Sequence, residues 1–143
     1  MEFHNKFQAA FQWDCAKPIS LGGSKRANFY EAEGKCQEMN GHLVSIHSEE
    51  ENDFVIDLIG SDIQYHTWIG LQRSENHSVW KWTDASEVNY LKWDTGEPDG
   101  RPGQKYDCGH IYNFVEGRPL ITDKKWNDAD CYWSEHYVCK KKA

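Results

Sequence analysis

The sequence predicts an α+β domain in which two helices precede a set of short strands. Residues 28–41 and 48–60 have apolar residues at helical spacing. The later part of the chain instead carries short runs of aromatic and β-branched residues. A long polar stretch between Asp84 and Asp107, rich in Gly, Pro, Asp and Asn, interrupts these runs. Helices first, strands later and then a long loop favour an α+β arrangement.

Residues 28–41 have the pattern of an amphipathic helix. Asn28 is a suitable N-cap, and Glu31 stands three residues later, which is the spacing of a reciprocal capping box. Gly41 is expected to be the left-handed residue that ends the helix. The apolar residues at helical spacing, which predict the buried face, are Phe29, Ala32, Cys36 and Met39.

Residues 48–60 repeat this pattern after a short β-branched segment. Ser48 is the expected cap, Glu51 its capping-box partner, and Gly60 the expected end of the helix. The predicted apolar side consists of Phe54, Ile56, Leu58 and Ile59. Residues 42–48, between the two helices, are predicted to form a strand.

The later strands are predicted from short aromatic and β-branched runs. These runs are "TWIGLQR" (67–73), "SVWKWTD" (78–84), "CGHIYNFV" (108–115) and "HYVCKK" (136–141). Trp80 and Trp82 alternate around Lys81, which is the period of a strand with one buried face. A loop as long as the one between Asp84 and Asp107 is usually functional or disordered.

Size and composition limit the class of protein. The 143 residues fit one domain. We expect this domain to occupy residues 15–143, after an N-terminal extension of residues 1–14. Aromatic residues make up 14% of the chain, which argues against disorder. The net charge of −7 argues against nucleic-acid binding, and the apolar runs are too short to insert in a membrane. The start of the chain lacks the basic residues and long apolar core of a signal peptide.

Five cysteines stand far apart in the sequence. They are Cys15, Cys36, Cys108, Cys131 and Cys139. None forms a CxxC pair, which argues against a structural zinc site and favours disulfides in an oxidising compartment. We therefore expect a secreted protein. The odd number leaves one thiol that is either free or paired with another chain.

Two pairs of oxygen-bearing side chains indicate a metal site. Glu97 and Asp99 flank a proline in the polar loop, and Asn127 and Asp128 lie in "KKWNDADC". If Cys108 and Cys131 bond, the two pairs lie on neighbouring strands and converge. Calcium binds six to eight such oxygens and removes the repulsion between clustered carboxylates. The alternative is that each pair belongs to an ordinary solvated turn.

The motifs together resemble the C-type lectin-like domain family from about Asn28 to Lys140. "NFYEAEGKCQEMNGHLVSIHSEEEN" resembles its two-helix half, and "TWIGL" its W-I-G-L strand. "EPD" resembles the E-P-N or Q-P-D triplet of its long loop, "WND" its W-N-D strand, and "HYVCK" its terminal strand. The ordered set is far more specific than any single motif. It implies the C-type lectin-like fold, with two helices packed on short antiparallel sheets and a long calcium-binding loop.

The resemblance also implies a site and a function. It implies the disulfides Cys36–Cys139 and Cys108–Cys131. It implies that one calcium ion is bound by Glu97, Asp99, Asn127 and Asp128, and that these residues also bind the sugar. Two vicinal sugar hydroxyls would complete the calcium coordination and bond to the same side chains. The expected partners are glycans on cell surfaces or glycoproteins. Cys15 is a candidate for a disulfide-linked homodimer, with a free thiol as the alternative.

Three departures from the family pattern bear on sugar specificity or on calcium binding. In that family E-P-N goes with mannose-type and Q-P-D with galactose-type sugars, so E-P-D is a hybrid, and keeping Glu97 first favours mannose. Tyr106 stands where the family often has a glutamate ligand, which predicts weaker calcium binding. Arg73 and His77 lie near the places of acids that would hold a second calcium. Galactose-type binding, or binding of protein or ice instead of sugar, remains the alternative.

The sequence does not predict an enzyme. The histidines show no HExxH spacing, and no G-x-S-x-G or glycine-rich phosphate loop is present. Glu97 and Asp99 could form an acid–base pair, but a calcium ion would hold both ionised and leave no general acid.

Overall fold

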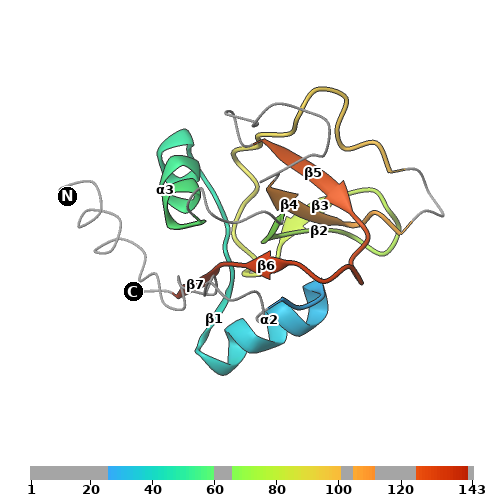
Figure 1. Cartoon of the computed structure of the whole chain (residues 1–143). Coiled ribbons are helices and arrows are strands. Elements are labelled where there is room, and N and C mark those ends of the chain that lie inside the picture. The colour runs from blue at the N-terminus through green and yellow to red at the C-terminus, as the bar shows by residue number, and fades with distance from the viewer. Residues whose placement is uncertain (1–25, 60–65, 101–104, 112–124, 142–143) are drawn as a thin grey trace.

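The computed structural model describes residues 26–59, 66–100, 105–111 and 125–141. These ranges contain the helices α2 (Phe29–Glu38) and α3 (Glu49–Ile59). They also contain the strands β1 (Gly41–Leu43), β2 (Thr67–Arg73), β3 (Trp80–Trp82), β4 (Cys108–Ile111), β5 (Trp126–Ala129), β6 (His136–Tyr137) and β7 (Cys139–Lys141). In Figure 1 the helices lie to one side and below, and the larger sheet and the long loop lie on the other side. The predicted α+β fold is confirmed.

The strands form two sheets. β1 pairs with β7 in the smaller sheet, and the larger sheet has the order β3-β2-β4-β5 with antiparallel neighbours. β6 joins the larger sheet by pairing with β2, and this pair is parallel. The register of β4 and β5 places His110 opposite Asn127 and Gly109 opposite Asp128. This register positions the side chains of the candidate site.

Helix α2 begins as predicted and ends one residue earlier than predicted. Oδ1 of Asn28 accepts from the Glu31 amide at 2.9 Å, and Oε1 of Glu31 accepts from the Asn28 amide at 3.3 Å. The left-handed residue after the helix is Asn40, with φ of 61°, and the expectation for Gly41 was wrong. Gly41 starts β1 instead, where a Cβ atom would lie 2.6 Å from the carbonyl oxygen of Lys140. The glycine is therefore required by the close approach of β1 and β7.

Helix α3 has half of the predicted capping box. Oγ of Ser48 accepts from the Glu51 amide at 3.1 Å. The Glu51 carboxylate returns to the His47 amide rather than to Ser48. The predicted end of this helix, Gly60, lies outside the described residues.

The buried face of α3 differs in part from the predicted one. Its buried apolar residues are Phe54, Val55 and Ile59, whereas Ile56 and Leu58 are only partly buried. Asn52 is also buried, and its Oδ1 accepts from the indole N–H of Trp126 at 2.9 Å. A polar position is therefore part of the buried face because a core indole needs a hydrogen-bond acceptor.

Most predicted strands form, several over shorter ranges. β2 occupies the whole of 67–73, but β1 ends at Leu43 instead of reaching residue 48. Beyond it, the Val44 amide donates to the Val138 carbonyl and the Val44 carbonyl accepts from the Gly70 amide, at 2.9 and 2.8 Å. The chain thus crosses between the two sheets here. The predicted strand at 136–141 is split at Val138 into β6 and β7.

Two disulfides tie the layers together. Cys36 of α2 is bonded to Cys139 of β7, and Cys108 of β4 to Cys131 after β5. These are the pairings that the resemblance implies. Cys15 and the proposed domain boundary lie outside the described residues, so its pairing and that boundary stay predictions.

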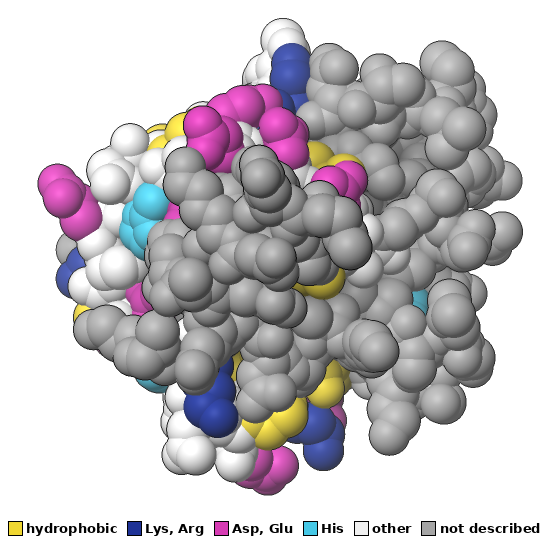
Figure 2. Space-filling view, turned by 90° about the vertical axis from the view of Figure 1, so that its left-hand side faces the viewer, with side chains coloured by type: hydrophobic (Ala, Val, Ile, Leu, Met, Phe, Trp, Pro, Cys, Tyr) yellow, Lys and Arg dark blue, Asp and Glu magenta, His cyan; other side chains and the backbone are white. Residues whose placement is uncertain are grey.

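The surface in Figure 2 is the side of the molecule that faces left in Figure 1. Among the described side chains, Asp and Glu gather near its top, and Lys and Arg lie near its edges and base. The described helices include none with the length and hydropathy needed to cross a bilayer.

Candidate functional site

The long loop is docked on β5 by backbone hydrogen bonds. The Trp126 amide donates to the Lys92 carbonyl, and the Asp94 amide donates to the Trp126 carbonyl, both at 2.8 Å. Trp93 therefore runs beside Trp126 in a parallel bridge, and the two indoles meet edge to face with centroids 6.2 Å apart. This contact carries the next residues of the loop to the side of β5.

Three carboxylates meet at the place so formed. Glu97 and Asp99 come from the loop and Asp128 comes from β5, and one oxygen of each lies within 4.8 Å of the others. The Glu97–Pro98 peptide bond is cis. Three of the four predicted site residues are thus brought together, although Asp128 is far from the other two in the sequence.

Asp128 also holds the loop in place. Its Oδ1 accepts from the Asp99 amide at 3.1 Å, and its Oδ2 accepts from the Gly100 amide at 2.8 Å. A Cβ atom on Gly100 would lie 2.6 Å from Oδ2 of Asp128. Glycine is therefore needed directly after the triplet so that the backbone can approach the carboxylate.

Glu97 is the carboxylate whose surroundings are least suited to its charge. Its Oε1 is buried and has no hydrogen-bond partner among the described residues. Burial, followed by hydrogen-bonding contact with Asp99 and Asp128 and by their charges, raises the pKa of Glu97 to about 8. Without a cation, this carboxyl therefore tends to keep its proton near neutral pH.

The three carboxylates fit a calcium ion. Calcium binds oxygen at about 2.3–2.6 Å, so two ligands of one ion lie at most about 5 Å apart. The 4.8 Å limit among the three oxygens lies within that span. A divalent cation would also offset the repulsion that disfavours ionised Glu97.

Asn127 directly precedes Asp128 on β5, and its side chain contacts a residue of β4. Its Nδ2 is 3.0 Å from Nε2 of His110, its cross-strand neighbour. Nδ1 of His110 lies 2.8 Å from Oε2 of Glu135, and both side chains are buried. When Nδ1 donates to Glu135, Nε2 is an acceptor, and the Asn127 amide donates one of its two N–H groups to it.

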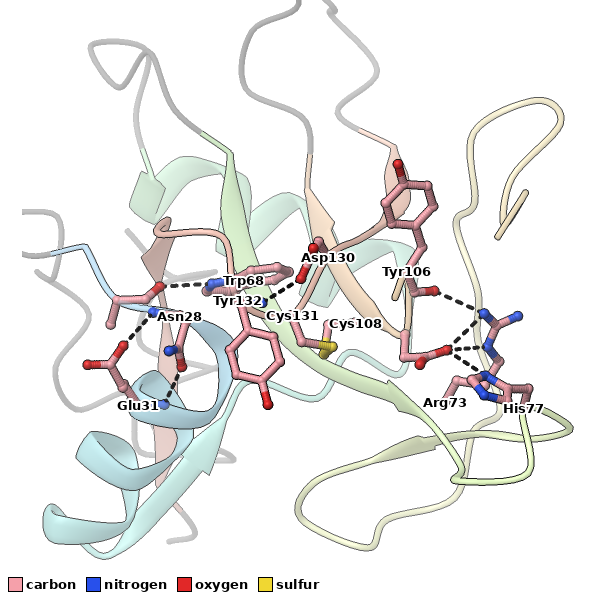
Figure 3. The surroundings of a disulfide bond; sticks show 12 residues. Asn28, Glu31, Trp68, Arg73, His77, Tyr106, Cys108, Asp130, Cys131 and Tyr132 are labelled. Carbon is pink, nitrogen blue, oxygen red and sulfur yellow. Dashed lines mark hydrogen bonds and ion pairs between the residues drawn. A yellow bond between two sulfur atoms is a disulfide. The ribbon is translucent and has the colours of Figure 1, made fainter. Parts of the chain in front are cut away.

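Arg73, at the end of β2, also binds the loop, and Figure 3 shows its contact with the backbone of Tyr106. Its guanidinium donates to the carbonyl oxygens of Gly100 and Tyr106, at 3.0 and 3.1 Å. It also pairs with Asp107 at 2.8 Å, and Nδ1 of His77 lies 3.0 Å from the same carboxylate oxygen. A fixed positive charge thus joins two backbone carbonyls and a carboxylate at the base of the loop.

The sequence did not reveal some of these supporting residues. His110 and Glu135 are distant in the chain and meet only through the pairing of β2 with both β4 and β6. Arg73 was noted only as a departure from a family pattern, and the need for Gly100 was not predicted. The available sequence signals were an arginine at the end of the 67–73 run and a glycine directly after Asp99.

The motifs on these elements match a known family. Residues 25–141 match the family described as Lectin C-type domain. The chain belongs to the C-type lectin domain family. Two relatives of this family that are named below are lectins rather than enzymes, which agrees with the sequence-based prediction.

Similar C-type lectin domain proteins have diverse properties. The chain is 34% identical to a "C-type lectin mannose-binding isoform" of Notechis scutatus scutatus over 80% of its own length and 71% of that protein. It is 38% identical to an "Alpha-N-acetylgalactosamine-specific lectin" of Patiria pectinifera over 77% of its own length and 66% of that lectin. The herring type II antifreeze protein has a TM-score of 0.70 and 28% identity, covering 82% of this chain and 85% of that one.

Proposed function

We propose that this C-type lectin domain binds carbohydrate in a calcium-dependent manner through the carboxylate cluster. The observation that supports this most is the convergence of Glu97, Asp99 and Asp128 around a buried, unpartnered carboxylate oxygen. Such an arrangement is unfavourable for a plain protein surface and favourable for a cation site. The uncharged side chain of Asn127 would complete the protein ligands through its Oδ1.

The proposed ligand is a pair of vicinal hydroxyls on a sugar ring. A bound calcium would supply open coordination positions for the two hydroxyl oxygens. Glu97 and Asp99 would accept hydrogen bonds from the two hydroxyl groups, because ionised carboxylates are acceptors only. Asn127 uses one amide N–H for His110 and so retains a second for the ligand. A site that holds only two hydroxyls of one sugar is expected to bind it with a Kd of about 1 mM, so useful avidity needs several sites.

We favour mannose-type sugars over galactose-type sugars. Glu97 keeps the first position of the mannose-type triplet, and Gly100 provides no aromatic ring directly after it. The relatives named above include a mannose-binding isoform and an N-acetylgalactosamine-specific lectin, so neither class is excluded. Asp99 is the residue that departs from both patterns.

A second candidate is binding of ice or protein without sugar. It is favoured by the likeness to the herring antifreeze protein and by Tyr106, which offers a phenol instead of a carboxylate. Retention of the other carboxylates favours the sugar-binding function.

Affinity chromatography with matched variants tests the proposal. The wild type should bind mannose-agarose in calcium and elute with a chelator, and it should bind galactose-agarose more weakly. Asp128→Asn should abolish retention, whereas Asp57→Asn, an exposed acid on α3, should not change it. Absence of retention on both resins, together with an unchanged melting temperature in calcium, would contradict the proposal.

The triplet itself can be tested by exchanging one oxygen for nitrogen. Asp99→Asn restores the mannose-type triplet and should raise the preference for mannose. Glu97→Gln gives the galactose-type triplet and should shift any remaining binding toward galactose. If neither variant changes the ratio of mannose to galactose binding, the triplet does not set specificity here.

We also propose the bounds of the sugar-binding domain and that the protein is secreted. We assign residues 15–143 to the sugar-binding domain and residues 1–14 to an extension. The two disulfides support a secreted protein, because such bonds persist in oxidising compartments.

A further inference from the structure

Large aromatic side chains are exposed together beside the first turn of α2. The described residues have five exposed large hydrophobic side chains, namely Tyr30, Val79, Leu91, Tyr132 and Trp133. Three of them are aromatic, and the rings of Tyr30 and Tyr132 have centroids 5.4 Å apart. Tyr132 and Trp133 are 65% and 48% exposed. Exposed apolar side chains that cluster in this way indicate an interaction surface.

The backbone that carries these rings is held in a fixed turn. The amides of Tyr132 and Trp133 donate to Oδ1 and to the carbonyl oxygen of Asp130, at 2.9 and 3.0 Å. The preceding Cys131 is bonded to Cys108, as Figure 3 shows. Binding to such a preordered surface loses little conformational entropy.

The rings of Trp133 and Tyr106, which we call the aromatic surface, lie next to the carboxylate cluster. The Trp133 ring lies 6.2 Å from the ring of Tyr106, measured between centroids. Tyr106 in turn adjoins Gly100, where a Cβ atom would lie 2.9 Å from that of Tyr106. Since the Gly100 amide donates to Asp128, one residue separates the proposed cation site from the start of the aromatic surface.

We propose that Trp133 and Tyr106 form a subsite for a further residue of a glycan whose end occupies the carboxylate cluster. This inference rests on the proposed function. The C–H face of a pyranose ring is apolar and packs against aromatic rings, while the indole N–H and phenol O–H groups can bond to its hydroxyls. The subsite therefore selects an uncharged oligosaccharide over a single sugar.

The size of the surface favours a glycan over a protein partner. A stable protein interface presents about 20–30 residues on each side. The aromatic surface comprises a few side chains, which suits one or two sugar rings. A second copy of the chain bound at this surface is an outcome that the experiment below distinguishes.

Isothermal titration with short and long ligands tests this subsite. The probes are mannose and mannotriose, and in parallel galactose and lactose, all in calcium. The wild type should bind the better oligosaccharide about tenfold more tightly than its monosaccharide. Trp133→Ala should remove this gain and leave the monosaccharide and calcium affinities unchanged. Trp133→Phe should keep most of the gain, and Val79→Ala, at a side chain of similar exposure, should keep all of it.

The outcomes separate the subsite from the proposed function. A wild type that binds monosaccharide but gains nothing from the oligosaccharides overturns the subsite alone. The subsite is also overturned if Trp133→Ala lowers the affinities for monosaccharide and oligosaccharide equally. It is overturned as well if sedimentation shows a dimeric wild type and a monomeric Trp133→Ala variant. A wild type that binds none of the four sugars overturns the proposed function, and the subsite with it.

Discussion

Glu97 provides the sharpest prediction, because its charge is unfavourable in the calcium-free protein. Its pKa is raised from 4.5 to about 8, so the folded state prefers the protonated form. The raised pKa means that protonated Glu97 stabilises the folded state. This contribution is fully present below about pH 4.5 and is lost as the pH rises through about 8. We expect Glu97→Gln, which carries no charge, to escape this loss.

The expected magnitude follows from the shift in pKa. The difference between 4.5 and about 8 corresponds to about 5 kcal/mol against the ionised form. Because of this difference, raising the pH from about 5 to about 8 should lower the free energy of unfolding of the wild type by about 2–4 kcal/mol relative to Glu97→Gln. The lower figure allows for water reaching a side chain that is only partly buried. For a chain of this size the loss equals roughly 5–12 °C in melting temperature.

The assay is urea unfolding followed by tryptophan fluorescence, in a chelator, at both pH values. Calcium should then restore the wild type at the higher pH and have little effect on Glu97→Gln. Glu87→Gln, an exposed glutamate of the same loop, is the matched control and should behave as the wild type. If the wild type and Glu97→Gln lose stability in parallel as the pH rises, the carboxylates do not repel one another and the reasoning is wrong.

Three further predictions test the supports of the site. Gly100→Ala places a methyl group against the Asp128 carboxylate and should weaken calcium binding about tenfold in a calorimetric titration, an unchanged affinity being evidence against the close approach. Arg73→Gln should lower the free energy of unfolding by about 1–3 kcal/mol, since it breaks a partly buried ion pair, and an effect below that of an ordinary surface substitution would contradict this role. Asn52→Leu should cost about 1–3 kcal/mol in urea unfolding because it leaves the indole N–H of Trp126 unpaired, and no cost would imply another acceptor.

The parts of the fold that could be predicted depend on neighbours in the sequence. The capping box of Asn28 and Glu31 is a contact between residues three apart, and β2 contains the short apolar run Trp68–Leu71. Gly41 was assigned the wrong role because its need arises from Lys140, which is remote in the chain and close only after β1 and β7 pair.

The candidate site divides in the same way. The family motifs name Glu97, Asp99 and Asp128, which the structure brings together. The contact of Asn127 with His110 depends on the register of β4 and β5, and a shift of one residue would move it to the other face. Local sequence patterns do not set this register, so such contacts become visible only in three dimensions.

The guanidinium of Arg73 has a consequence for how such domains diversify. Because it donates hydrogen bonds to the carbonyl oxygens of Gly100 and Tyr106, it fixes two points of the chain independently of the residues between them. The sequence within that interval can then change in composition or length while these two points stay in place. Evolution of this segment therefore need not disturb the three carboxylates beside it.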